Sequence, residues 1–279
     1  MTAPLLSVRA LRVSFPTRGG GRVNVVDGVS FDLRRERLGI VGESGSGKSM
    51  TGRAILRLIR RPGHVDAARL AFEGEELTTL SERRMRALRG ARISMVMQDP
   101  RYSLNPVMTV GRQIAEALRV HARLGRAATR ARVIEMLKSV RINDSERVAA
   151  MYPHEVSGGM GQRIMIAMML IPRPSLLIAD EPTSALDVSV QAQVLDLMDD
   201  LVRGNGMGLI LISHDLDLVA RYCDRILVMN SGRVVETCEA RRLGEARHPY
   251  TRGLLASVPR MRETRAELPT IDRRAWEGT

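Results

Sequence analysis

The sequence predicts an α/β fold in which short, buried strands alternate with helices. Three apolar runs carry this prediction, at residues 38–41, 175–179 and 208–213. Glycine, acidic or polar residues follow these runs, at the strand ends where parallel sheets bind their ligands. After the first run, apolar residues recur with helical spacing. They are Ala54, Ile55, Leu58 and Ile59.

Two additions to this core are predicted. Residues 5–33 alternate in the manner of strands, with the glycine-rich segment 17–22 as a hairpin loop. The core continues over 175–236 and contains a hairpin turn at 230–232. A mainly helical insertion lies between these parts, at about 99–160. Its two apolar faces comprise Ile114, Ala117 and Leu118, and Val133, Met136, Leu137 and Val140.

The composition indicates a globular protein and disfavours several functional classes. Of the 279 residues 44% are apolar, so the chain can bury a substantial core. Aromatic residues make up only 3%, which argues against stacking platforms for single-stranded nucleic acid. Two cysteines, Cys223 and Cys238, do not make a disulfide framework or a metal cluster, so reduced thiols are expected.

Charge and hydropathy predict a soluble protein that stays inside the cell. The longest uninterrupted apolar stretch, 164–172, is shorter than the roughly 18 residues of a membrane-spanning helix. The N-terminus lacks the apolar region of a signal peptide. The net charge of +12 favours anionic partners, but the arginines are scattered along the chain. We interpret the short basic clusters at 33–37 and 81–90 as solvated helix faces.

A glycine-rich loop between the first strand and its helix predicts a phosphate site. Gly42 to Ser49 match the pattern G-x-x-x-x-G-K-S. The glycines let backbone N–H groups turn toward one anion, and the helix beginning near Lys48 adds its positive dipole end. The Lys48 ammonium can reach phosphates where a guanidinium would be bulky, and the Ser49 hydroxyl would bind Mg²⁺. The predicted nucleotide-binding residues here are Gly42, Glu43, Ser44, Gly45, Ser46, Gly47, Lys48, Ser49 and Met50.

Polar residues after three other apolar runs predict hydrolysis. Asp180 would hold the Mg²⁺ shell, and Glu181 would orient or deprotonate the attacking water. His214 follows the third run, where a sheet edge would meet the γ-phosphate. Gln98 follows Ile93–Met97 and offers an amide oxygen to Mg²⁺ or water. Taken singly, each has a structural alternative, such as a solvated carboxylate or a packed histidine.

A second glycine-rich loop, VSGGMGQR at 156–163, contains no lysine. It predicts a helix N-terminus with Ser157 as the capping residue and the helix starting at Gly161. A cap exposes backbone donors, so the same loop could also contact an anion.

In their order, these motifs resemble those of the ATP-binding subunits of ABC transporters, over residues 5–258. The matching motifs are GESGSGKS as Walker A, Gln98 as the Q-loop, VSGGMGQR as the signature, LLIADE as Walker B, SALD at 184–187 as the D-loop and His214 as the switch histidine. The segments QDPRYSLNPVMTVGRQIAEAL and RHPYTRGLLASVPR look like the branch serving oligopeptide, dipeptide and nickel-type importers.

This resemblance implies a P-loop NTPase core (RecA-like) with an N-terminal antiparallel β-subdomain and an inserted α-helical subdomain. A single ABC ATPase domain would span 1–258, and 259–279 would form a C-terminal tail that looks poorly packed. ATP and Mg²⁺ are the implied cofactors. The implied catalytic residues are Glu181, His214 and Gln98, and the implied metal-binding residues are Ser49, Gln98 and Asp180.

The resemblance also implies partners. Two ATP-binding subunits pair head to tail, and the signature loop of one closes over the γ-phosphate held by the other. The residues concerned are Ser157, Gly158, Gly159, Met160 and Gln162 in the signature and Ser184 and Asp187 in the D-loop. The second subunit is a paralogue or a second copy, and a paralogue is favoured. Two transmembrane permease subunits and an extracytoplasmic solute-binding protein complete the set, with no nucleic acid expected. The chain would lie peripherally at the cytoplasmic face of the bacterial inner membrane.

Some positions depart from the family pattern. Val156 replaces a leucine, Gly161 replaces an arginine common in this branch, and Arg35 replaces a glycine. Phe15 is the candidate for stacking on adenine, with core packing as the alternative. Because no cysteine follows Cys238, no iron–sulfur cluster is expected.

Two other functions remain open at this point. A soluble ABC ATPase acting on nucleic acid or ribosomes is favoured by the charge of +12, but the coiled coils or duplicated units it predicts are not seen in the sequence. A largely non-hydrolysing ATP-binding subunit of a heterodimer is the second alternative. The presence of Lys48, Asp180, Glu181 and His214 argues against it.

Overall fold

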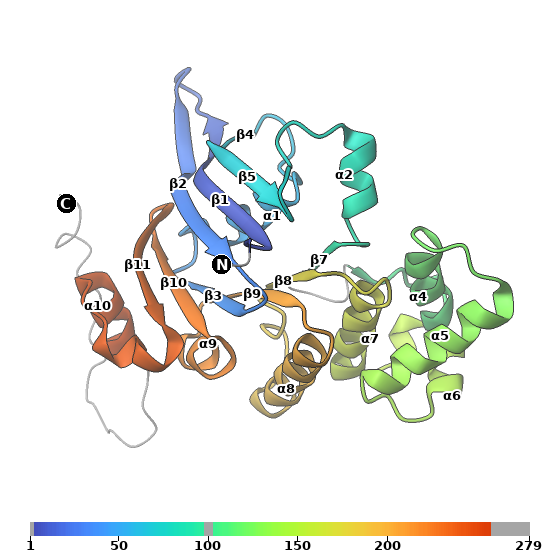
Figure 1. The fold of residues 1–279 in the computed structure, drawn as a ribbon. Helices are drawn as coiled ribbons and strands as arrows, with labels where there is room; N and C mark the ends of the chain where they lie inside the picture. Colours follow the sequence, from blue (N-terminus) through green and yellow to red (C-terminus); the bar gives the residue numbers. More distant parts are fainter. Residues whose placement is uncertain (1–2, 98–102, 258–279) are drawn as a thin grey trace. The chain divides into compact units, whose positions relative to one another are not determined.

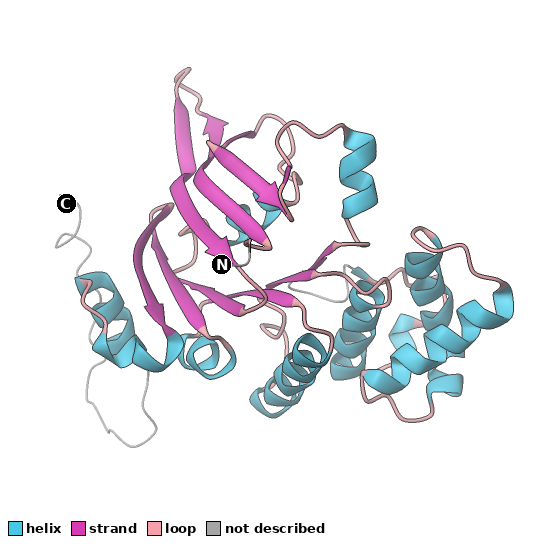
Figure 2. Ribbon diagram, in the orientation of Figure 1, coloured by secondary structure: helices cyan, strands magenta, loops and turns pink. Residues whose placement is uncertain are grey.

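The computed structural model describes residues 3–97 and 103–257. It divides into two compact units, the first comprising Met1–Thr79 with Ile210–Thr279 and the second Leu80–Leu209. Strand β9 (Gly208–Ser213) crosses the boundary between them in the sequence. Both units contain strands and helices (Figure 2), so the predicted α/β class is confirmed.

An antiparallel sheet forms the N-terminal part of unit 1 (Figure 1). Its strands are β1 (Leu6–Pro16), β2 (Arg22–Leu33), β4 (His64–Asp66), β5 (Arg69–Phe72) and β6 (Glu75–Glu76). They lie in the order β2-β1-β5-β6, with β4 beside β1. Leu6 pairs with Leu33, and Pro16 pairs with Arg22 beside the loop. The predicted hairpin around 17–22 is therefore confirmed.

The other strands and helices of unit 1 include the two elements that flank the glycine-rich loop at 42–49, which we call the phosphate loop. These strands and helices are β3 (Arg37–Val41), α1 (Lys48–Ile55), α9 (Leu216–Tyr222), β10 (Arg225–Asn230), β11 (Arg233–Glu239), the 3-10 helix η2 (Ala240–Glu245) and α10 (Pro249–Ser257). Strands β3 and β10 are parallel, while β10 and β11 form an antiparallel hairpin. Positive φ angles of 46° at Ser231 and 82° at Gly232 form its turn, as predicted from the sequence.

Helix α1 is shorter than the sequence pattern indicates, because it ends at Ile55 and excludes Leu58 and Ile59. Arg57 adopts a φ of 53°, and its N–H donates to the Ala54 carbonyl at 2.9 Å. The next N–H, of Leu58, donates to the Arg53 carbonyl at 2.8 Å. This pair of bonds is the Schellman arrangement that closes a helix through a left-handed residue. The spacing of apolar residues does not reveal this helix end, because a left-handed backbone conformation causes it.

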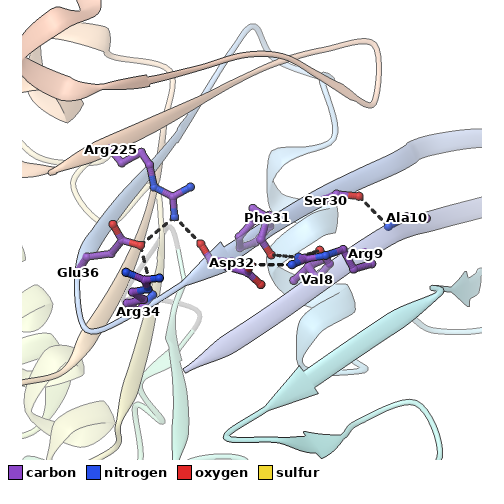
Figure 3. A network of polar contacts seen from close by, with 9 residues as sticks. All are labelled: Val8, Arg9, Ala10, Ser30, Phe31, Asp32, Arg34, Glu36 and Arg225. Carbon is purple, nitrogen blue, oxygen red and sulfur yellow. Dashed lines mark hydrogen bonds and ion pairs between the residues drawn. The ribbon is translucent and has the colours of Figure 1, made fainter. Parts of the chain in front are cut away.

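Arginine contacts tie the end of β2 to β1 and β10 (Figure 3). Arg9 donates to the Phe31 carbonyl at 3.1 Å and to the Asp32 carboxylate at 2.6 Å. Arg225 of β10 donates to the Asp32 carbonyl and, at 2.8 Å, to Glu36. The hydrogen bond from Arg9 lowers the pKa of Asp32 despite partial burial of this carboxyl. These contacts fix the chain just before β3, which leads into the phosphate loop.

A second ion cluster centres on Asp27 of β2. Arg233 contacts its carboxylate at 2.8 Å and Arg12 at 3.2 Å. The hydrogen bond from Arg233, opposed by partial burial and helped by Arg12, lowers the pKa of Asp27. The backbone N–H of Asp27 also donates to the Gly232 carbonyl at 2.8 Å. Asp27 therefore links β2 to the turn between β10 and β11.

We expect Asp27→Asn to reduce the free energy of unfolding by about 1 kcal/mol at neutral pH, since largely exposed pairs contribute little. The folded-state pKa lies below the unfolded value of about 4, so the contribution is present above that pH. It is lost as the pH falls through the folded pKa. Urea unfolding from about pH 7 to about pH 3 measures this, with the exposed Asp66→Asn as control. A deficit that stays constant down to the lowest pH would contradict the assignment.

Unit 2 contains two parallel strands and most of the helices. Its elements are α2 (Glu82–Leu88), β7 (Ile93–Val96), α4 (Val110–Arg119), α5 (Arg126–Ser139), α6 (Ser145–Ala150), the 3-10 helix η1 (Pro153–Glu155), α7 (Gly158–Leu170), β8 (Leu176–Asp180) and α8 (Val188–Gly204). Helices α4, α5 and α6 form the predicted helical insertion (Figure 1). The limits of 99–160 for this subdomain stay a prediction.

The apolar faces of α4 and α5 are buried largely as predicted. Buried positions include Ile114, Leu118, Val133, Leu137 and Val140. Ala117 and Met136 are half-buried, while their neighbours Ala115 and Ile134 are buried. Among the described helices, none has both the length and the apolar character needed to cross a membrane.

Candidate functional site

The glycine-rich loop at 42–49 joins β3 to α1, as the sequence predicts. Gly42 and Gly47 have φ angles of 152° and 96°. A Cβ added to Gly42 would lie 2.1 Å from the Met229 carbonyl oxygen, and one added to Gly47 would lie 2.5 Å from that of Val25. Because both obstacles are backbone atoms, a side chain at either position would force the loop to shift. The loop keeps its path only with glycine at these two positions.

Lys48 is the first residue of α1, and only 5% of it is exposed. Its ammonium donates to the carbonyl oxygens of Gly42 at 2.7 Å and Glu43 at 2.8 Å, and lies 3.4 Å from the Ser46 hydroxyl oxygen. An ammonium with three donors thus stands at the N-terminus of a helix, where backbone N–H groups also favour negative charge. This combination of donors suits a ligand with several anionic oxygens, such as a phosphate chain.

Two other predicted residues lie in unit 1. His214 directly follows β9 and is exposed, while the neighbouring Asp215 caps α9 by accepting from the Leu218 N–H at 3.0 Å. Phe15 lies near the end of β1 and is half-buried. A Cβ added to Gly63 would lie 2.7 Å from the ring, so part of Phe15 packs against this glycine. Its stacking on adenine stays a prediction.

The predicted acid pair lies at the end of β8 in unit 2. Asp180 is the last residue of this strand and is 4% exposed. Glu181 follows with a φ of 48°, and its carbonyl accepts from the Ser184 N–H at 3.3 Å and hydroxyl at 3.2 Å. A residue other than glycine in this left-handed region costs about 1 kcal/mol. The chain therefore turns sharply directly after Asp180, with Glu181 as the first residue of the turn, and such strained positions are frequent at functional sites.

The signature loop forms the N-terminus of α7, and Ser157 is its cap. The Ser157 hydroxyl accepts from the Met160 N–H at 3.3 Å, so the predicted capping role is confirmed. The expected helix start at Gly161 is wrong, because α7 begins three residues earlier, at Gly158. Gly158 and Gly159 consequently belong to the first turn, whose N–H groups have no partners within the helix. Ser157 and Gly158 are exposed, as an anion contact from outside this unit would require.

Gln162, in the second turn of α7, is 1% exposed. Its amide donates to the carbonyl of Pro182, the residue after Glu181. A Cβ added to Gly159 would lie 2.8 Å from Val190 of α8, so α7 and α8 are in close contact. Gln162 thus acts within its own chain by joining the signature helix to the segment after the acid pair. A contact from Gln162 to nucleotide stays a prediction.

Asp187, predicted as part of the D-loop, is the cap of α8. It accepts from the N–H groups of Ser189 at 3.1 Å and Val190 at 3.0 Å. The Ser189 hydroxyl, 2.7 Å away, is the first cause of a lowered pKa at Asp187. The other D-loop residue, Ser184, is exposed and bonds back to Glu181. Signature, acid pair and D-loop thus form one connected cluster in unit 2.

Sequence reasoning missed Tyr250 as part of the phosphate loop's surroundings. Tyr250 is 1% exposed, and its hydroxyl accepts from the Glu43 N–H at 3.1 Å. The only signal was the RHPYT segment, which served above as a mark of the transporter branch. Gln98, predicted to contact Mg²⁺ or water, lies outside the described residues.

Comparison with known proteins supplies the family. The family model described as ABC transporter matches residues 26–184. The chain belongs to the ABC transporter family. The matched span includes the phosphate loop, the signature and the acid pair. The family assignment made from the motifs is thereby confirmed.

Relatives of this ABC transporter chain carry names for peptide transport. A putative peptide import ATP-binding protein of Brucella abortus is 49% identical over 97% of this chain and 82% of its own length. The oligopeptide transport ATP-binding protein OppD of Bacillus subtilis is 48% identical over 94% and 74%, respectively. The dipeptide transport ATP-binding protein DppD of the same organism is 48% identical over 96% and 81%. These names agree with the branch predicted from the sequence.

Solved structures confirm the fold class. A dimeric bacterial ABC transporter cassette matches with a TM-score of 0.74 and 25% identity, covering 85% of this chain and 99% of that chain. A dimeric ATP-binding cassette in a post-hydrolysis state, bound to ADP and Pi, matches with the same TM-score at 23% identity. The P-loop NTPase type of core is therefore the fold of this ABC transporter chain.

Proposed function

We propose that this chain is the ATP-hydrolysing subunit of an ABC importer for peptides or related small solutes of the dipeptide, oligopeptide or nickel type. The observation that carries the proposal is the nearly buried Lys48 ammonium, held by loop carbonyls at the start of α1. A phosphate chain can compete for those donors. The peptide class is supported by identities of 48% and 49% to relatives named for peptide transport.

ATP binding falls to residues of unit 1. The N–H groups of Gly42 to Ser49 and the Lys48 ammonium receive the phosphates, and Phe15 stacks on the adenine. The loop fits this role, because backbone atoms already occupy the space where side chains at Gly42 and Gly47 would stand. Its walls are therefore fixed before the ligand arrives, which limits the ordering cost of binding.

Hydrolysis falls to Glu181, which orients or deprotonates the attacking water, and to His214 and Gln98, which contact the γ-phosphate region. Asp180, Ser49 and Gln98 would hold Mg²⁺. All three offer oxygen donors, the ligand type this ion prefers, and Asp180 is a nearly buried carboxylate at a strand end. When bound there, Mg²⁺ would neutralise negative charge on the nucleotide's phosphates.

A second ATP-binding subunit, either a paralogue or a second copy, completes each site. The exposed cap Ser157 and the first-turn residues Gly158, Gly159 and Met160 would close over the γ-phosphate held by the partner subunit. Ser184 and Asp187 of the D-loop, next to the acid pair, would face the same partner. Through its bond to the Pro182 carbonyl, Gln162 would link closure of the signature loop to the chain's own acid pair.

The remaining partners follow from the importer proposal. Two permease subunits form the membrane path, and the helical segment of α4, α5 and α6 docks on their cytoplasmic loops. An extracytoplasmic protein delivers the solute. The chain then works peripherally at the cytoplasmic face of the bacterial inner membrane, as one ABC ATPase domain over 1–258.

Uptake by the reconstituted assembly tests this function. The chain is assembled with two permease subunits and a second ATPase subunit, either a paralogue or a second copy, and placed in proteoliposomes with a solute-binding protein. We expect ATP-dependent uptake of labelled di- or oligopeptide that disappears without ATP. ATP turnover with no uptake of any peptide or nickel chelate would contradict the importer proposal. Turnover stimulated by DNA in a steeply salt-dependent manner would support the nucleic-acid alternative instead.

A further inference from the structure

The side chain of Tyr250, on helix α10, contacts the phosphate loop at Glu43. The two bonded residues, Glu43 and Tyr250, are 207 positions apart in the sequence, and both lie in unit 1. The donor is the Glu43 backbone N–H, and the acceptor is the Tyr250 hydroxyl oxygen at 3.1 Å, within the normal range for such bonds. With 1% of Tyr250 exposed, water has little access to replace this contact.

The position of Tyr250 is itself fixed from two sides. Glu236 of β11 accepts from the backbone N–H groups of Arg247 at 2.7 Å and His248 at 3.3 Å. The His248 ring nitrogen Nδ1 accepts from the Tyr250 N–H at 3.2 Å. Bonds to an ionised acceptor are stronger than neutral ones, so Glu236 holds the start of α10 firmly to β11 (Figure 1).

Glu236 is ionised under physiological conditions. Burial raises the pKa of its carboxyl, but polar neighbours, among them the bonded N–H groups of Arg247 and His248, outweigh burial, so the net pKa is lowered. The anchor of α10 is therefore a carboxylate, and it does not depend on the phosphate loop.

Both backbone polar groups of Glu43, the N–H and the carbonyl, therefore form hydrogen bonds to side chains. Its N–H is bound by Tyr250 and its carbonyl by the Lys48 ammonium, at 2.8 Å. Anionic oxygens of a phosphate chain compete for the Lys48 ammonium, whereas the Tyr250 hydroxyl belongs to α10, whose start is bonded to Glu236 and not to the loop. Tyr250 thus supports the Glu43 segment in the loop conformation that the structure shows.

We propose that Tyr250 is a positioning residue for the phosphate loop, through which α10 keeps the Glu43 segment in its binding conformation. This inference rests on the proposed function, in which the loop binds ATP. The alternative is a purely structural role, in which the Tyr250 hydroxyl bonds to the nearest donor and removal of this hydroxyl lowers only the overall stability of the chain. The two roles predict different effects of Tyr250→Phe on the conformation of the phosphate loop.

The test is Tyr250→Phe in the full chain, which keeps the ring and removes the hydroxyl. Loss of this part-buried hydrogen bond loosens the backbone at Glu43, so we expect ATP affinity to fall about five- to tenfold. Hydrogen exchange followed by mass spectrometry should show faster exchange in peptides covering 38–49, with other peptides unchanged. The matched control is Tyr222→Phe, a buried tyrosine of α9 in the same unit, which should leave both measurements unchanged.

Failure of this inference and failure of the proposed function give different results. A wild-type chain that does not bind ATP contradicts the proposed function. A wild-type chain that binds ATP, together with a Tyr250→Phe variant of equal affinity and equal exchange at 38–49, overturns the positioning role. Exchange that rises uniformly across the chain also overturns it, because that result marks a purely structural residue.

A second variant keeps the inference testable if Tyr250→Phe does not fold. Glu236→Gln retains the hydroxyl but removes the charge that anchors the start of α10. We expect the same direction of change at 38–49, with a smaller loss of ATP affinity. Unchanged exchange there and unchanged affinity would overturn the proposal.

Discussion

The Glu181→Gln variant is expected to lower the ATP turnover of the assembled transporter by about a hundredfold or more, while ATP still binds. Glutamine has nearly the shape of glutamate, but its amide cannot accept the proton of the attacking water. Glu181 stands directly after the nearly buried Asp180, at a backbone φ of 48°. The strained residue is thus the proposed base itself, next to the carboxylate that we propose to bind Mg²⁺. Steady-state phosphate release measures the effect.

The same variant should accumulate as an ATP-bound pair of ATPase subunits, detected by its larger size in gel filtration with ATP and Mg²⁺. Glu135→Gln is the matched control, because Glu135 is an exposed acid of α5 that pairs with Arg132 at 2.7 Å. It should leave turnover unchanged. Wild-type turnover in Glu181→Gln would remove Glu181 from its role as the base.

The Lys48→Ala variant is expected to weaken ATP binding at least about a hundredfold, because it removes the charged donor from the phosphate loop. In the wild type, Lys48 as a whole is 5% exposed, and its ammonium bonds to the carbonyls of Gly42 and Glu43. Lys48→Arg should also weaken binding strongly, since a planar guanidinium does not fit where the compact ammonium bonds these two carbonyls. Equilibrium binding of a fluorescent ATP analogue measures both variants.

The sequence itself offers a matched control for this experiment. Lys138 is the only other lysine of the chain, and it lies exposed on α5. Lys138→Ala removes the same charge from the chain's total and should bind ATP as the wild type does. Equal losses in both variants would mean that total charge, and not the loop donor, governs binding.

Features with a local cause were predictable from the sequence. The buried strand β8 follows from an uninterrupted apolar run, and the loop at 42–49 follows from glycines and a lysine at fixed spacing. The cap Ser157 follows from the small polar residue before a helical pattern. In each case neighbouring residues specify the structure, so one short window of sequence is sufficient.

Features that depend on backbone conformation, or on residues far apart in the sequence, were not predictable. Helix α1 ends at Ile55 because Arg57, two residues later, adopts a left-handed conformation that apolar spacing does not mark. Helix α7 begins at two glycines, which a propensity argument places outside a helix. The bond between Glu43 and Tyr250 joins residues 207 positions apart, so only the folded chain reveals it.

The central claim is that ATP is held between two subunits, by the phosphate loop of one and the signature loop of the other. The most direct measurement is a structure of the Glu181→Gln assembly with ATP and Mg²⁺. We predict that the cap Ser157 and the first turn of α7 contact the γ-phosphate bound at Lys48 of the partner subunit. A structure in which Ser157 faces bulk solvent, far from any nucleotide, would contradict the account.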